Sequence, residues 1–213
     1  GHLKVLKWLS RNRRERCTCE KNVFDWAAAN GHLEVVQHLH LLCMDGCTPK
    51  AMNWAAKNGQ LNVVKWLHEN RAEGCTREAI DGAAGNGHLD VVQWLHSNRF
   101  EGATIRAMNH ASLNGHLHVV RWLHENRTEG CTDVAMDNAA KNGHLEVVKF
   151  LHENRVEGCS TAALDWSCGR GHLDVVEFLL EKRKEGCTEK AMSWSSHGGH
   201  NKVSAVLNAA NPR

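Results

Sequence analysis

The chain has 213 residues, of which 42% are hydrophobic and 23% are charged, a composition typical of a folded domain. Its 26 Lys and Arg residues nearly balance 24 Asp and Glu residues, so a net charge of +2 gives no general attraction to nucleic acid or to an anionic membrane. No apolar stretch approaches the roughly 18 to 20 residues that span a bilayer, and no secretory pattern opens the chain. We therefore expect an intracellular protein, cytoplasmic or nuclear, that has no membrane partner.

A Gly-His-Leu-x-Val-Val motif recurs along the chain, with small variations, at a constant interval. Its glycines are 28 residues apart at Gly31, Gly59, Gly87, Gly115, Gly143, Gly171 and Gly199, and Gly1 precedes the first of them by 30. A period of about 20 to 50 residues is typical of a solenoid, in which each repeat buries its apolar face only against its neighbours.

The period divides the chain into a leading second helix and seven repeats that form one array. The leading helix is expected at residues 1–16, and the repeats at 17–46, 47–74, 75–102, 103–130, 131–158, 159–186 and 187–213. Because the chain opens in mid-repeat without a Met, we expect a fragment that further repeats or another domain flanked.

The repeat at residues 131–158 shows the first helix that each copy predicts. Thr132 is a good N-cap, and a helix of about 10 residues follows. Asn142 and Gly143 end it, because glycine readily adopts the left-handed conformation of a C-terminal turn. Its apolar stripe consists of Ala135, Met136, Ala139 and Ala140.

The second helix of that repeat carries a broader apolar face. Glu146 suits the positive end of its dipole, and only the short segment 155–158 leads to the next repeat, which is too short for a β-hairpin. The face consists of Leu145, Val147, Val148, Phe150 and Leu151. The pattern predicts an all-α, right-handed helical-repeat solenoid of stacked helix-turn-helix repeats, with the small first helices on the concave side.

These residues resemble the ankyrin repeat in its first helix, Gly turn and second helix. The period of 28 is shorter than the 33 of that family, so the resemblance is to a short variety that lacks the projecting β-hairpin fingers. The family's Thr-Pro-Leu-His motif is also replaced, with Asp, Asn or Ser where its His would be. The resemblance implies protein recognition without catalysis.

The cysteines predict buried, reduced thiols. Stacked helices lie about 8 to 10 Å apart, whereas a disulfide needs Cα atoms within about 7 Å, so equivalent cysteines in adjacent repeats should not bridge. Ala103 fills the same position in the remaining repeat, which indicates a small apolar site. The six equivalent cysteines are Cys17, Cys47, Cys75, Cys131, Cys159 and Cys187.

The 16 histidines raise the hypothesis of a metal site, which their spacing disfavours. Equivalent histidines are one stacking distance apart, too far to share a zinc ion, so we expect capping and packing roles. Candidate catalytic residues recur in most repeats, whereas an active site needs one asymmetric constellation. We expect no enzyme, cofactor, metal or small-molecule substrate, and we expect the Asp, Asn and Ser series that begins at Asp25 to hydrogen-bond adjacent loops.

The tryptophans fall into two sets. Those of the second helix share a position with Phe150 and Phe178, which indicates packing between repeats. Those of the first helix occupy a position that also accepts Gly, His and Asn, which leaves two interpretations: a binding position, or packing between first helices. A second variable position precedes each Gly turn by two residues. From these positions we predict partner-binding residues at Trp26, Trp54, Lys57, His110, Leu113, Asn138, Lys141, Trp166, Trp194 and His197.

The function that this pattern favours is a non-catalytic protein–protein interaction scaffold that binds a partner of unknown identity along its concave face. One alternative is a nucleic-acid-associated solenoid that uses tryptophan stacking and the basic cluster at Arg11, Arg13, Arg14 and Arg16. The balanced charge disfavours it. The other alternative is a passive spacer between flanking domains.

Overall fold

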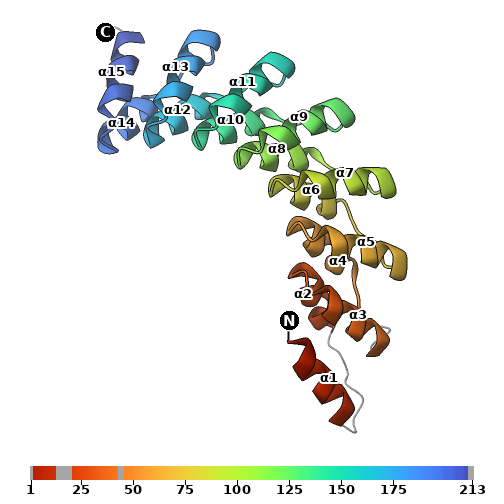
Figure 1. Cartoon of the computed structure of the whole chain (residues 1–213). Coiled ribbons are helices and arrows are strands. Elements are labelled where there is room, and N and C mark those ends of the chain that lie inside the picture. Colours follow the sequence, from red (N-terminus) through yellow and green to blue (C-terminus); the bar gives the residue numbers. More distant parts are fainter. Residues whose placement is uncertain (1, 13–20, 43–45, 211–213) are drawn as a thin grey trace. The chain divides into compact units, whose positions relative to one another are not determined.

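The computed structural model describes residues 2–12, 21–42 and 46–210. Contacts group the chain into two compact units, which we call unit 1 (residues 1–104) and unit 2 (residues 105–213). All regular secondary structure in the described residues is helical (Figure 1). None of the described helices has the length and apolarity needed to cross a bilayer.

Helix pairs follow one another in each unit at the interval that the motif predicts. Unit 1 contains α1 (Leu3–Asn12), α2 (Lys21–Ala29), α3 (Leu33–Leu42), α4 (Pro49–Lys57), α5 (Leu61–Asn70), α6 (Glu78–Gly85) and α7 (Leu89–Asn98). Unit 2 contains α8 (Ile105–Leu113), α9 (Leu117–Asn126), α10 (Asp133–Lys141), α11 (Leu145–Asn154), α12 (Thr161–Arg170), α13 (Leu173–Lys182), α14 (Glu189–His197) and α15 (Asn201–Ala210).

The turn between α10 and α11 forms as predicted. Gly143 has a φ of 74°, and its N–H donates to Ala140 O at 3.1 Å. The N–H of His144 donates to Ala139 O at 2.9 Å, so two carbonyls at the end of α10 are satisfied in the pattern of a Schellman motif. A left-handed residue is needed here, which only glycine supplies without strain.

Small residues bring the first helices of adjacent repeats close together. Ala51, Ala55 and Ala56 of α4 are fully buried. Within each unit, first helices such as α4 and α6 or α12 and α14 pack closely, whereas second helices such as α5 and α7 make few contacts with each other (Figure 1). The first helices therefore line the inner side of the stack within each unit.

A buried Asp or Asn of each first helix holds the start of the next. The backbone N–H of Thr48 donates to Asp25 Oδ1 at 3.1 Å, and its hydroxyl donates to Asp25 Oδ2 at 2.6 Å. This confirms that the Asp and Asn members of the series link adjacent loops, whereas Ser193 at its end is exposed. The same two-bond pattern joins Asn53 to Thr76, Asp81 to Thr104, Asn109 to Thr132, Asp137 to Ser160 and Asp165 to Thr188.

One predicted cap differs in detail. Thr132 is the N-cap residue of α10, but its side chain makes no capping bond to the helix. Its hydroxyl instead accepts the Asn109 amide at 3.0 Å. Where the partner is Asp137, the hydroxyl of Ser160 donates to the carboxylate and still accepts the N–H of Ala162 at 3.1 Å.

Histidines that begin the second helices cover the glycine turns of the preceding repeat. A Cβ on Gly143 would lie 2.6 Å from Nδ1 of His172. The Nε2 of His172 lies 3.1 Å from Lys141 O, so it carries the proton that this carbonyl accepts. His88 covers Gly59 in the same way. These histidines have packing and hydrogen-bonding roles, as the sequence predicts.

Candidate functional site

The predicted binding residues lie in two series that follow the first helices. We call the middle position of these helices the first-helix row and the position before the turn the turn row. The first-helix row consists of Trp26, Trp54, Gly82, His110, Asn138, Trp166 and Trp194. The turn row consists of Ala29, Lys57, Gly85, Leu113, Lys141, Gly169 and His197.

Each of the ten predicted binding residues is at least partly accessible. Trp26 is 63% exposed and Trp194 is 39% exposed, so these two rings offer apolar surface to solvent. The exposed set also includes Lys57, His110 and His197, and the half-buried set consists of Trp54, Leu113, Asn138, Lys141 and Trp166.

The two rows touch each other across adjacent repeats. The Lys141 ammonium lies 4.7 Å from the ring centroid of Trp166. A Cβ on Gly169 would lie 3.0 Å from Cβ of Trp194, and one on Gly82 would lie 3.0 Å from Cβ of Lys57. A turn-row residue therefore packs against the first-helix residue that follows it by 25 positions.

This contact between the two rows was not predicted from the sequence, although the sequence contains a signal for it. Large residues face small ones at an offset of 25, as in Trp194 with Gly169 and Lys57 with Gly82. The first-helix tryptophans were interpreted either as binding residues or as packing between first helices. Each interpretation fits part of the set, because Trp54 and Trp166 are half-buried, whereas Trp26 and Trp194 are exposed.

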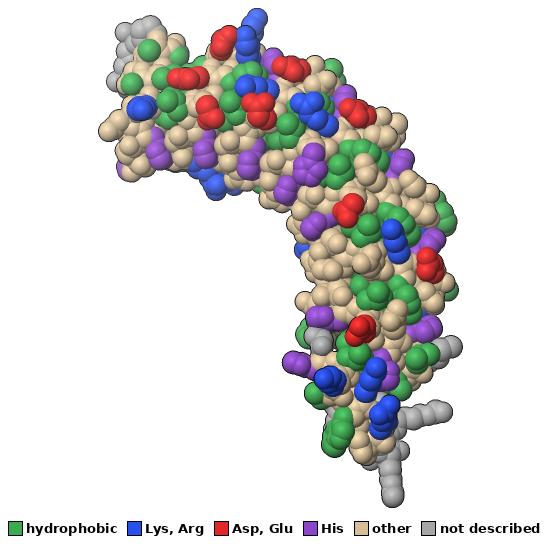
Figure 2. Space-filling view, viewed as in Figure 1, with side chains coloured by type: hydrophobic (Ala, Val, Ile, Leu, Met, Phe, Trp, Pro, Cys, Tyr) green, Lys and Arg blue, Asp and Glu red, His purple; other side chains and the backbone are tan. Residues whose placement is uncertain are grey.

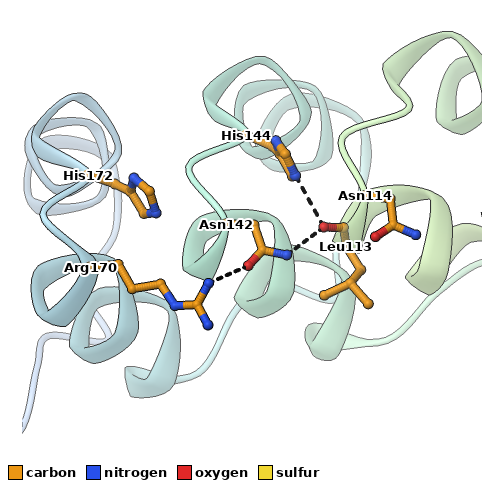
Figure 3. Close-up of a pocket in the computed structure, with 6 residues that line it drawn as sticks. All are labelled: Leu113, Asn114, Asn142, His144, Arg170 and His172. Atoms are coloured by element: carbon orange, nitrogen blue, oxygen red, sulfur yellow. Dashed lines mark hydrogen bonds between the residues drawn. The ribbon is translucent and has the colours of Figure 1, made fainter.

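A groove crosses the turns of unit 2 beside the turn row, and it was also missed. We call it the turn groove, and its volume is about 630 Å³ (Figure 3). The Asn142 amide donates to Leu113 O at 2.7 Å, and Nε2 of His144 donates to the same oxygen at 3.1 Å. The Nη1 of Arg170 donates to Asn142 Oδ1 at 2.9 Å. Its lining residues are Leu113, Asn114, Asn142, His144, Arg170 and His172.

The second-helix aromatic residues pack between repeats. The rings of His40 and Trp66 meet edge to face, with centroids 5.3 Å apart. His124 with Phe150 and His152 with Phe178 repeat this contact. Trp66 is half-buried, whereas Trp8 in α1 is 63% exposed.

The loop between repeats holds an ion pair that sequence reasoning did not single out. Nε of Arg155 donates to Glu157 Oε2 at 3.2 Å, and its Nη2 donates to Oε1. A Cβ on Gly130 would lie 2.5 Å from the Arg155 guanidinium, so the pair covers the preceding loop. The recurring Arg-x-Glu-Gly-Cys spacing was the available signal. Equivalent pairs are Arg71 with Glu73, Arg99 with Glu101, Arg127 with Glu129 and Arg183 with Glu185.

The described cysteines are free thiols. Burial, and to a smaller extent a Glu carboxylate of the next loop, together raise the pKa of Cys75, Cys131 and Cys159 to about 11. Cys17, Cys19 and Cys43 lie outside the described residues.

Two other predictions, the basic cluster and the absence of a metal site, can be compared only with the described residues. Arg11 is exposed at the end of α1, whereas Arg13, Arg14 and Arg16 of the basic cluster lie outside them. Within the described parts of the chain, no three His, Cys, Asp or Glu side chains converge to hold a metal ion.

Stacked helix-turn-helix pairs with a glycine turn define a helical-repeat solenoid. The family model of ankyrin repeats, which holds three copies, matches residues 24–109, 80–160 and 108–191. The chain belongs to the ankyrin repeat family. Ankyrin repeats are in general modules of protein–protein interaction and are generally non-catalytic.

A solved structure shows the same fold. The crystal structure of the human ASB11 ankyrin repeat domain is similar at a TM-score of 0.67 and 15% sequence identity. The match covers 89% of this chain and 98% of that chain. No curated protein matches this chain.

Proposed function

We propose that this chain is a non-catalytic scaffold that binds a protein partner along the first-helix row and the turn row. The observation that carries the proposal is the contrast between constant and variable positions. Packing residues such as Ala51 and Ala135 recur in equivalent places, whereas the accessible first-helix row changes from Trp to Gly, His or Asn.

The exposed tryptophans support this assignment physically. Exposed aromatic rings within a polar setting are the usual anchors of protein interfaces. Trp26 exposes 63% of its surface and Trp194 exposes 39%. Lysines beside the rings, such as Lys190 at 5.9 Å from Trp194, add charge that a partner would meet.

Two further parts of the proposal concern the array and its compartment. We propose that the seven repeats act as one array that spans residues 17–213, with the leading helix before it. We also propose that the protein works in a reducing compartment, cytoplasm or nucleus, because free thiols at a recurring position, buried at Cys47 and Cys131 and half-buried at Cys75, Cys159 and Cys187, suit such a compartment.

Replacement of exposed tryptophans tests the proposal. The variant Trp26→Ala with Trp194→Ala should lose the proteins that the immobilised chain retains from a cell lysate, because it removes the two most exposed anchors. Phe100→Ala is the matched control, because Phe100 is 91% exposed but lies in a loop outside both rows. Equal retention by both variants would refute the assignment of these rows. Helical circular dichroism and cooperative melting should be the same in the two variants.

A further inference from the structure

The turn groove of unit 2 contains one residue that breaks a regular hydrogen-bond series. At the residue before three of the turn glycines, an Asn side chain donates to the turn-row carbonyl of the preceding repeat. Asn58 donates to Ala29 O at 2.8 Å, Asn86 to Lys57 O at 2.6 Å and Asn142 to Leu113 O at 2.7 Å. The equivalent position is Arg170 at the end of α12 and Gly198 after α14, so only Arg170 places a charged side chain there.

The fold does not need an arginine at this position. The carbonyl of Lys141, which an Asn at position 170 would reach, already accepts Nε2 of His172 at 3.1 Å. Arg170 is exposed and donates Nη1 to Asn142 Oδ1 at 2.9 Å. Figure 3 shows the guanidinium beside Asn142, on the same side as the ring of His172. The exposed side chain is thus held in place by an amide.

The charge of Arg170 also differs from that of the loop arginines. Arg155 and Arg183, like the other loop arginines, are paired with a Glu two residues later. Among the described residues, Arg170 has no carboxylate partner, and the residues that line the turn groove include no Asp or Glu. Lys141 nearby lies over Trp166 rather than against an acid. The groove therefore offers positive charge without an internal counter-ion.

The side chains around the turn groove are consistent with its positive charge. Histidine side chains form a row along unit 2 in Figure 2. His144 and His172 line the turn groove, and backbone carbonyls accept their Nε2 protons. The nearest acids in sequence, Glu146 and Asp174, lie in the first turns of α11 and α13, and Glu146 is paired with Lys149 at 2.9 Å. Neither acid is paired with Arg170 in the described residues, where its side-chain partner is Asn142.

We infer that the turn groove binds an acidic, extended segment of the protein partner and that Arg170 anchors one of its carboxylates. This inference rests on the proposed function and names the chemistry of the partner. A guanidinium presents parallel N–H groups that match a carboxylate and so favours a two-bond contact. The groove crosses the ends of α8, α10 and α12, which at about 10 Å per repeat accommodates roughly six extended residues.

A peptide fits this groove better than a nucleic acid does. A strand of phosphates needs several cations in a row and aromatic faces on which bases stack. The groove lining holds one permanent cation and no Trp or Phe. Leu113, at its far end, provides an apolar contact of the kind that a peptide side chain uses.

The test is a titration of the nitrogen-15-labelled chain of residues 1–213 with an acetylated, amidated hexaglutamate peptide, followed by backbone amide NMR. We expect saturable shifts at Gly143 and Gly171, with none for hexaglutamine. Arg170→Asn should weaken hexaglutamate binding about fivefold, the loss expected for one exposed charge-assisted contact. It should fold normally, because Asn stands at this position in other repeats. Arg170→Lys should retain more affinity than Arg170→Asn.

Lys184→Asn is the matched control, because it removes the same charge from an exposed loop residue outside the groove. Its affinity for hexaglutamate should stay unchanged. Equal weakening by Lys184→Asn and Arg170→Asn, or absence of saturable shifts, would overturn the inference. So would tighter binding of a six-nucleotide thymidine strand that also depends on Arg170.

The outcome separates this inference from the proposed function. If the tryptophan variant loses its partners while Arg170→Asn binds hexaglutamate normally, the scaffold assignment stands and the acidic-segment inference fails. If the tryptophan variant retains its partners while Arg170→Asn loses hexaglutamate, the row assignment fails and the groove remains a carboxylate site.

Discussion

Asp137 holds Ser160 of the next repeat by two hydrogen bonds: the backbone N–H reaches Oδ1 at 2.8 Å and the hydroxyl reaches Oδ2 at 2.6 Å. The same chain makes this link with an amide at Asn53 and Asn109. The link between repeats therefore needs an oxygen acceptor and a second polar atom, but it does not need a negative charge.

Replacement of Asp137 should separate hydrogen bonding from charge. Asp137→Ala should lower the free energy of unfolding by about 2 kcal/mol, because it leaves the Ser160 N–H without its acceptor. Asp137→Asn should be neutral or stabilising, because it keeps both bonds and removes a buried charge. Urea unfolding at neutral pH measures both. A loss in Asp137→Asn as large as that in Asp137→Ala would show that the charge itself is required.

The difference in stability between the native chain and Asp137→Asn should depend on pH, because the fold shifts the pKa of Asp137. Burial raises this pKa above its ordinary value of 3.8, although the two bonds from Ser160 lower it. The folded state then binds the proton more tightly than the unfolded state, so this group loses stability as pH rises through the raised pKa. The stability advantage of Asp137→Asn over the native chain should grow from about pH 4 to neutral pH. A constant difference across that range would contradict the shift.

Glycine turns should differ in their sensitivity to alanine according to what covers them. Gly143 and Gly199 have positive φ values of 74° and 71°, so alanine is strained at both. His172 covers Gly143, whereas nothing lies within 4 Å of a Cβ on Gly199. Gly199→Ala should lose about 1 kcal/mol and Gly143→Ala about 2 kcal/mol or more. Equal losses in urea unfolding would mean that the histidine moves aside at no cost.

Buried thiols should react slowly in the folded protein. Burial and the nearby Glu157 carboxylate raise the pKa of Cys131 while Arg155 lowers it, and the result is a pKa of about 11. Because the thiolate is the reactive form, alkylation by iodoacetamide at pH 8 should be about a hundredfold slower than in the unfolded chain. Mass spectrometry of the peptide that contains Cys131 measures the two rates. Similar rates in folded and denaturant-unfolded protein would exclude a buried thiol.

The edge-to-face contact of Trp66 with His40 should tolerate another aromatic ring. Phe150 and Phe178 make the same contact in unit 2, with centroids 5.6 and 5.5 Å from their histidines. Trp66→Phe should therefore lower the free energy of unfolding by about 1 kcal/mol or less, and Trp66→Ala by about 2 kcal/mol. Phe100→Ala, at a 91% exposed position, should change it little. A thermal or urea melt that ranks the three variants differently would contradict the packing role.

Much of the fold was predictable because its determinants are local. Thr132 before α10, the Asn142–Gly143 stop and the apolar faces of both helices depend on residues within one repeat, and the structure confirms these helix bounds. The spacing of the copies predicted stacking, and the Asp25 series predicted links between loops, because every repeat meets an identical neighbour.

The candidate site was only partly predictable, because it depends on which atoms of adjacent repeats meet. Sequence variation located Trp26, Trp54 and Lys141, but only the stacking of α10 on α12 placed the lysine over Trp166 and left Trp54 half-buried. From the local sequence, Arg170 is only the last residue of a helix. That its charge has no carboxylate partner becomes clear only from the Asn142 and His172 side chains around it. Short-range spacing thus determined the helices and their order, whereas contacts between residues 25 to 31 positions apart decided which side chains remain available to a partner.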